Sequence, residues 1–125
     1  MEKYLLIGLG GAIGSISRYV LSRMVYHSAG ESFPYGTLAV NIIGCFLIGL
    51  LMSVMQERLV TSPNYRYLLV IGLLGGLTTF SSFSYETMGL MRMGSITASL
   101  FNIFYNVAGC LASTWCGYMI GKNIL

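Results

Sequence analysis

Four long apolar segments, separated by short polar breaks, dominate the chain. They run over about Tyr4–Val25, Leu38–Met55, Tyr67–Met91 and Ile96–Ile120. Each is close to the length of about 20 residues that crosses about 30 Å of hydrocarbon. Because a segment in lipid must satisfy its own backbone hydrogen bonds, helices are predicted rather than open strands. The pattern therefore predicts an all-α integral membrane protein with four transmembrane helices and a single domain.

The composition agrees with a membrane location. Of the 125 residues, 55% are hydrophobic and 9% are charged, whereas roughly a quarter are charged in an ordinary soluble domain. The net charge is +3, but the seven basic residues are spread along the chain and form no cluster that would track nucleic acid. We expect membrane lipid around the protein and no nucleic-acid partner.

The first segment contains a glycine-rich stretch, GLGGAIGS, that begins at Gly8. Gly10 and Gly14 have three residues between them, a spacing at which small residues let helices in lipid approach closely. The glycines miss the GxGxxG spacing of a dinucleotide-binding loop, and no strand precedes them. We interpret them as a packing surface, which Gly117 and Gly121 repeat in the fourth segment.

Several polar residues lie within the spans. Arg18 either extends to the nearer interface or forms an anion-attracting vestibule. The Asn41 amide either bonds to a neighbouring helix or donates to a passing anion. A polar stripe in the fourth segment, which either lines a wet space or packs against another polar face, consists of Asn102, Asn106, Cys110 and Ser113.

The residues expected of an enzyme or a metal site are missing from the pattern. His27 is the one histidine and falls in a polar break, and no acidic pair lies within the spans. Cys45, Cys110 and Cys116 lie in apolar segments without metal-ligand spacing, so we expect inert thiols. The chain is predicted not to be an enzyme.

The basic residues give only a weak preference for one orientation in the membrane. Four crossings place the N-terminus, the Gln56–Arg66 loop and the C-terminus on one side, with Lys3, Arg58, Arg66 and Lys122. The other side has Arg23 and Arg92, and Arg18 if it extends that way. Since a Lys and Arg excess normally sets orientation, the chain could insert both ways. Two opposite copies would form an antiparallel, dual-topology homodimer.

A cluster of glycine, hydroxyl and phenylalanine residues, GGLTTFSSFS, begins at Gly75 in the third segment. The glycine pair and the β-branched Thr78 and Thr79 disfavour a continuous helix, so the third helix is predicted to be broken near Gly75–Thr79. A break there releases backbone carbonyls. If two antiparallel copies met at this depth, their carbonyls would suit a hard cation such as Na⁺. A glycine-mediated helix crossing is the alternative.

Phe80 and Phe83 follow the expected break on one helical face. Two phenylalanines usually indicate packing, but here Ser81 and Ser84 accompany them. Aromatic ring edges are electropositive, so edges and hydroxyls could partly replace the water around a small anion without a fixed positive charge. Glu86 could serve proton coupling, lie at a pore mouth or pair with a basic residue.

Three stretches together resemble one family. GGLTTFSSFSYE, VNIIGCFLIG and GGAIGSISRY, which begin at Gly75, Val40 and Gly10, look like the signature stretches of the Fluc (CrcB) fluoride ion channels of bacteria. The four-span plan, the length and the weak orientation preference match that family as well.

The resemblance implies one channel domain over residues 1–125, working as a passive fluoride-selective channel in the bacterial cytoplasmic (inner) membrane. It implies a dual-topology antiparallel homodimer with two pores and a central structural Na⁺, through which accumulated cytoplasmic fluoride leaves. By motif match, the anion pathway would include Asn41, Phe80, Phe83, Ser81, Ser84 and Arg18, and we expect Asn106 of the fourth segment to join them. The Na⁺-binding carbonyls would be those of Gly75 and Thr78.

Two other classes of membrane protein compete with this interpretation. Small multidrug-type or proton-coupled transporters also have four spans, but they depend on a carboxylate within the first helix, and Tyr4–Val25 contains none. A non-transporting scaffold subunit would leave the hydroxyl and phenylalanine cluster without a purpose.

Overall fold

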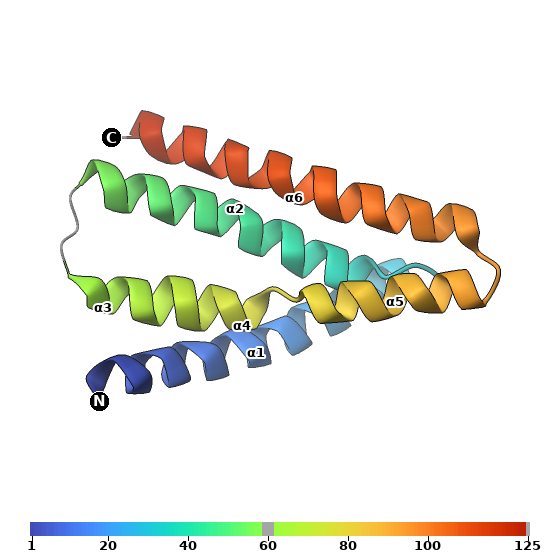
Figure 1. Ribbon diagram of the computed structural model, residues 1–125, viewed down its shortest axis with the longest axis horizontal. Coiled ribbons are helices and arrows are strands. Elements are labelled where there is room, and N and C mark those ends of the chain that lie inside the picture. Colours follow the sequence, from blue (N-terminus) through green and yellow to red (C-terminus); the bar gives the residue numbers. More distant parts are fainter. Residues whose placement is uncertain (59–61, 125) are drawn as a thin grey trace.

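The computed structural model describes residues 1–58 and 62–124, so residues 59–61 of the expected Gln56–Arg66 loop lie outside the described part. The elements are α1 (Glu2–Ala29), α2 (Tyr35–Glu57), α3 (Pro63–Tyr65), the π-helix η1 (Arg66–Leu74), α4 (Gly75–Leu77), α5 (Phe80–Arg92) and α6 (Ile96–Ile124). The third span is composite, because α3, η1 and α4 follow one another directly and α5 begins after a short break (Figure 1).

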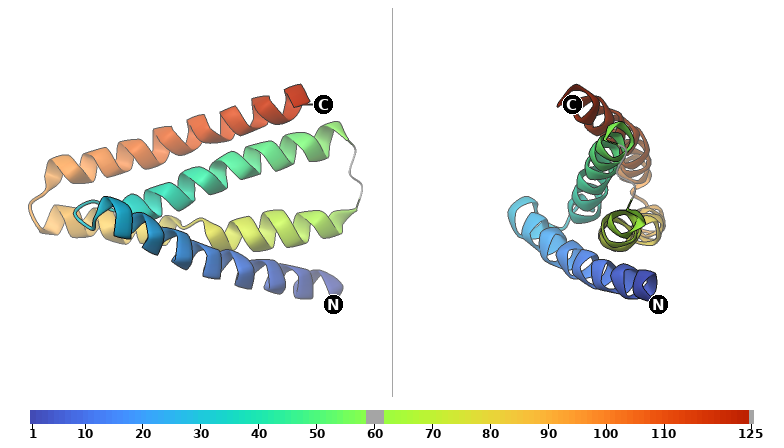
Figure 2. Two further views of the ribbon diagram at one scale, coloured as in Figure 1. Left: turned by 180° about the vertical axis from the view of Figure 1, so that it is seen from behind. Right: turned by 90° about the vertical axis from the view of Figure 1, so that its left-hand side faces the viewer.

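Four helices are long and apolar enough to cross a membrane: α1, α2, the composite span Pro63–Arg92, and α6. They confirm the four predicted spans and extend each of them by a few residues. Both chain termini lie at the end of the molecule where α2 ends, and the α1–α2 and α5–α6 connections lie at the other end (Figures 1 and 2). This arrangement is the one that four crossings require.

The described side chains are distributed as expected for lipid rather than water. Large apolar residues are exposed on the long helices, as Leu5 at 72% and Leu111 at 69% illustrate. Polar residues such as Ser99 and Asn102 are completely buried. A soluble domain shows the opposite tendency. The protein is therefore a multi-pass membrane protein.

Glycines bring two pairs of helices into backbone contact. A Cβ atom at Gly10 or Gly14 of α1 would collide with backbone carbonyls of η1. A Cβ atom at Gly117 of α6 would collide with the Phe46 carbonyl of α2, and one at Gly121 would lie 2.9 Å from the Leu50 carbonyl oxygen. These contacts confirm the predicted packing surfaces of both helices, since small residues allow close approach in lipid.

The break in the third span is confirmed, and of the two causes predicted for it, the threonine pair holds and the glycine pair does not. Gly75 and Gly76 remain helical, and the extended residues are Thr78 (φ −87°, ψ 155°) and Thr79 (φ −151°, ψ 115°). β-Branched residues favour extended backbone, so the threonine pair accommodates the break. Gly76 instead allows helix crossing, because a Cβ there would lie 2.7 Å from the Gly11 carbonyl oxygen of α1.

The π-helical winding of η1, Arg66–Leu74, was not predicted. π-Helical turns are usually short and rare. Here the wider winding lies against the glycine surface of α1, and a Cβ atom added at Gly72 would lie only 3.0 Å from the Gly10 Cα. Backbone packing between the two helices therefore accompanies this unusual winding.

Candidate functional site

The break in the third span is held by one side chain from α2. The Thr79 backbone N–H donates to Asn41 Oδ1 at 2.8 Å, and Asn41 Nδ2 donates to the Thr79 carbonyl at 3.1 Å. In a continuous helix, the Thr79 N–H would instead bond to the Gly75 carbonyl four residues earlier. Asn41 thus satisfies both polar groups of an extended residue in the span, which lipid could not do.

Asn41 also begins a buried chain of amide hydrogen bonds. Its Nδ2 donates to Asn106 Oδ1 at 3.1 Å, and Asn106 Nδ2 donates to Asn102 Oδ1 at 2.9 Å. Asn102 Nδ2 donates to Thr87 Oγ1 at 2.8 Å, and that hydroxyl donates to the Phe83 carbonyl at 2.7 Å. The chain links α2, α6 and α5, so the polar stripe of the fourth segment packs against other polar groups.

Both amide hydrogens of Asn41 are therefore engaged within the protein. An amide NH₂ group has two donors, and those of Asn41 are directed to the Thr79 carbonyl and to Asn106. Asn102 and Thr87 were absent from the predicted site. The spacing of four between Asn102 and Asn106 was the available signal, because it places both amides on one helical face.

The two phenylalanines meet edge to face beside this chain. Their ring centroids lie 5.2 Å apart with an interplanar angle of 63°, a favourable aromatic geometry. Phe83 is buried, whereas Phe80 is 77% exposed. Both rings line a cavity of about 330 Å³, with Asn41, Cys45, Thr78, Thr79, Asn106, Val107, Cys110 and Leu111. The structure thus brings together the two rings, Asn41 and Asn106.

Of the hydroxyl groups at and after the break, one caps the next helix and others are exposed. Thr79 Oγ1 accepts the Ser82 N–H at 3.1 Å and so caps α5. Ser81 Oγ lies 3.3 Å from the same oxygen. Ser81 and Ser84 are exposed on the outside of the chain and do not line the phenylalanine cavity. Ser82 and the Thr79 cap were not predicted from the sequence.

Arg18 of α1 also reaches the break, which Asn41 of α2 contacts as described above. Its Nη1 donates to the Thr78 carbonyl at 3.5 Å, the long end of hydrogen-bond distances. Arg18 is half-buried and lines a second cavity of about 250 Å³, together with Thr37, Ser82 and Glu86. It therefore lies in a polar recess rather than at the lipid surface.

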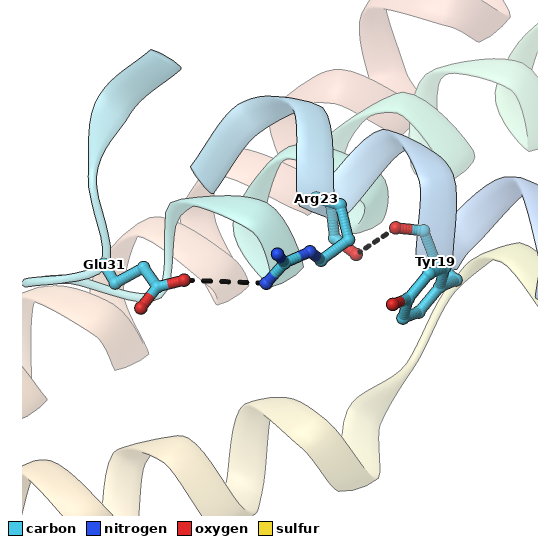
Figure 3. Close-up of polar contacts among 4 residues, drawn as sticks. Tyr19, Arg23 and Glu31 are labelled. Carbon is cyan, nitrogen blue, oxygen red and sulfur yellow. Dashed lines mark hydrogen bonds and ion pairs between the residues drawn. The ribbon is translucent and has the colours of Figure 1, made fainter. Parts of the chain in front are cut away.

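Glu86 connects this recess to the end of the molecule. Its Oε1 accepts from Thr37 Oγ1 at 2.8 Å, and its buried Oε2 has no partner among the described residues. It also lines a neighbouring cavity of about 470 Å³ that includes Arg23 and Glu31. Those two residues form an exposed ion pair at 3.6 Å between α1 and the following connection (Figure 3). Glu86 thus lies between two cavities and pairs with a hydroxyl.

The carbonyls released by the break provide oxygen ligands of the kind that a hard cation prefers. Gly75 is exposed on the outer face, and the N–H that would have bonded its carbonyl is engaged by Asn41. The Thr78 carbonyl already accepts from Arg18 but retains a second lone pair. Hard divalent cations take about six or more oxygen ligands, so two carbonyls of one chain would be an incomplete shell.

Comparison with known proteins shows the family of the chain. Residues 5–118 match the family described as "CrcB-like protein, Camphor Resistance (CrcB)". Proteins named "Fluoride-specific ion channel FluC" from Citrifermentans bemidjiense and Geotalea uraniireducens are each 48% identical, and one from Geobacter sulfurreducens is 46% identical. Each alignment covers 99% of this chain and 100% of the relative. The chain therefore belongs to the CrcB-like family, as its three signature stretches indicated.

Proposed function

We propose that the protein is a passive, fluoride-selective ion channel through which accumulated cytoplasmic fluoride leaves a bacterial cell. The full-length similarity to proteins named fluoride-specific ion channels carries this proposal. The chain belongs to a family of ion channels and is not an enzyme, as the sequence predicted. We place it in the cytoplasmic membrane as one channel domain over residues 1–125.

The anion pathway passes the phenylalanine cavity. Phe80 and Phe83 are already edge to face there, and electropositive ring edges can replace part of the water around a small anion. Among the described residues that line this cavity there is no Lys or Arg, so an anion would not be held too tightly to leave. Arg18, in the separate polar recess beyond the break, attracts anions toward the pathway, and Glu86 lies at its mouth.

Asn41 does not offer a free amide hydrogen to the anion. Because both its amide hydrogens are engaged, an anion at Asn41 must displace Asn106 or the Thr79 carbonyl. We propose that Asn41 holds the break and exchanges its bond to Asn106 for one to the anion as it passes. Asn106 then keeps its two bonds to Asn102.

The working unit is an antiparallel homodimer with a central structural Na⁺. In one chain, Phe80 is 77% exposed, and Ser81 and Ser84 are exposed beside it, so a second copy would enclose the open side of the cavity. Two copies would also contribute two sets of Gly75 and Thr78 carbonyls. The cation would neutralise the partial negative charge of these oxygens.

Passive efflux from proteoliposomes tests the function. Vesicles loaded with potassium fluoride or potassium chloride are diluted into a buffer that contains neither anion, without a proton gradient. A K⁺ carrier balances the charge, and the external anion is followed by electrode. We expect rapid loss of fluoride and retention of chloride. Fluoride flux that needs a proton gradient would instead support a small proton-coupled transporter in which Glu86 carries the proton.

A further inference from the structure

Two cysteine side chains meet at the phenylalanine cavity. Cys45 of α2 and Cys110 of α6 both line it, and each lies four residues after a member of the hydrogen-bonded pair Asn41 and Asn106, so the two cysteines occupy facing positions one helical turn further on. α2 and α6 are held together by backbone contact, because a Cβ at Gly49 would collide with the Thr114 carbonyl. The two thiols therefore lie on helices that are in close backbone contact one turn away.

We propose that Cys45 and Cys110 form a two-thiol site for a soft, two-coordinate cation, Hg²⁺ above all, and that the bound cation closes the cavity to anions. The part of this proposal that concerns blocking rests on the proposed channel function. The binding part does not, because it depends only on the two thiols.

The chemistry of the cavity selects the cation. Thiolates prefer soft cations, and Hg²⁺ forms two collinear bonds to sulfur. Binding breaks two S–H bonds, forms two S–Hg bonds and releases two protons to water, with no change of oxidation state. The product is neutral, which matters because a net charge is costly in an apolar cavity. Ag⁺ or Cu⁺ with two thiolates would leave one negative charge there.

Harder or higher-coordinate metals fit less well. Structural Zn²⁺ takes four ligands, and the described residues contain no group of three or more His, Cys, Asp or Glu that could hold a metal ion. The other polar residues of the cavity are Asn41, Asn106, Thr78 and Thr79, whose neutral oxygens are poor partners for a soft cation.

The position of the two thiols explains why bound Hg²⁺ should block the passage of anions. The cavity of about 330 Å³ is also lined by Phe80, Phe83, Asn41 and Asn106. A cation that bridges Cys45 and Cys110 would share this space with the rings and amides. Its bulk would narrow the room that a passing anion needs, and its two thiolates would present sulfur lone pairs to that anion.

Cys116 provides a matched control on the same helix as Cys110. It is exposed and does not line the cavity. We therefore compare four proteins: the natural chain, Cys116→Ser, Cys45→Ser and Cys110→Ser. Each is reconstituted as the full-length channel, treated with a Hg²⁺ salt, and washed with a monothiol, which strips Hg²⁺ from single thiols more readily than from a chelating pair.

Retained Hg²⁺ is measured by mass spectrometry, and its sulfur neighbours are counted by X-ray absorption. We expect one Hg²⁺ with two sulfur neighbours per chain in the natural protein and in Cys116→Ser, and at least tenfold less in Cys45→Ser and Cys110→Ser. Loss of Hg²⁺ from the natural chain on washing, or equal retention by all four proteins, would overturn the site.

Fluoride efflux, compared with the flux of the same protein before treatment, tests the block. We expect at least a tenfold fall in the natural chain and in Cys116→Ser, reversed by a dithiol, and little change in the other two. If Hg²⁺ is retained but fluoride efflux is undiminished, the proposed block is wrong, whereas the proposed two-thiol binding site stands. Absence of fluoride efflux before any Hg²⁺ is added would instead contradict the proposed function, while the retention measurement still decides the site.

Discussion

Asn41 and Thr79 are joined by two hydrogen bonds, one in each direction, between a side-chain amide and the backbone of an extended residue. Both residues are buried. The pair resembles one rung of a β-ladder placed inside a membrane span. It explains how α4 and α5 can be separated without leaving the Thr79 N–H and carbonyl unsatisfied.

Replacing Asn41 by Leu should therefore lower the thermal stability of the protein in detergent. The substitution leaves the Thr79 N–H and carbonyl without partners, and each unsatisfied buried group costs about 1–3 kcal/mol. Asn64→Leu is the matched control, because Asn64 makes one exposed hydrogen bond to Glu2. Equal melting temperatures for the two variants would show that the two Asn41 hydrogen bonds do not stabilise the break.

Phe80→Ile and Phe83→Ile should each reduce fluoride efflux by about tenfold or more, which corresponds to about 1.4 kcal/mol in the barrier. Isoleucine keeps an apolar surface but has no electropositive ring edge. Phe104→Ile is the control, since Phe104 is 62% exposed on α6 and lies outside the phenylalanine cavity. Dimer content is measured by gel filtration in each case. Undiminished flux in both cavity variants would remove the rings from the anion pathway.

Alanine substitutions at two glycines of α1 should have opposite effects on thermal stability. At Gly14 the new Cβ would collide with the Leu73 carbonyl, so α1 and η1 must separate and stability should fall. At Gly8 the new atom would have no described neighbour within 4 Å apart from the adjacent backbone of its own helix, and better helix propensity should add up to about 1 kcal/mol. The comparison is made by thermal unfolding in one detergent. A loss of stability at both positions would indicate that glycine is needed along α1 for another reason.

Charge in the connections should decide orientation, because Lys and Arg are retained on the cytoplasmic side. A chain with Glu57→Lys, Ser62→Lys and Asn64→Lys should insert in one orientation and lose fluoride export. Export should return when it is expressed with a chain that carries His27→Lys and Ser95→Lys, at the other end of the molecule. The measurement is growth of fluoride-sensitive bacteria on fluoride. Full resistance from the first chain alone would contradict the antiparallel dimer.

The four spans were readable from the sequence because lipid imposes one strong requirement on each segment. A stretch that crosses hydrocarbon must be apolar, of suitable length and able to satisfy its own backbone. The glycine surfaces at Gly10, Gly14 and Gly117 were predicted for a similar reason, since close helix approach in lipid needs small residues at helical spacing. Local chemistry sufficed for these features.

The arrangement of side chains inside the site could not be read from the sequence, because it depends on contacts between helices. Whether the Asn41 amide is free or engaged is decided by Thr79 and Asn106, which lie on other elements. The outward position of Ser84, the π-helical winding of η1 and the meeting of Cys45 with Cys110 are decided in the same way.

The physical reason is the geometry of a helix in lipid. Each residue rotates the side-chain direction by about 100°, so a small difference in register or rotation moves a residue from the cavity to the lipid face. Hydrophobicity cannot set that rotation when almost every face is apolar. The sequence by itself determined how many helices cross the membrane and where glycine and hydroxyl residues gather. Only the tertiary structure decided which of those residues face one another across the helices.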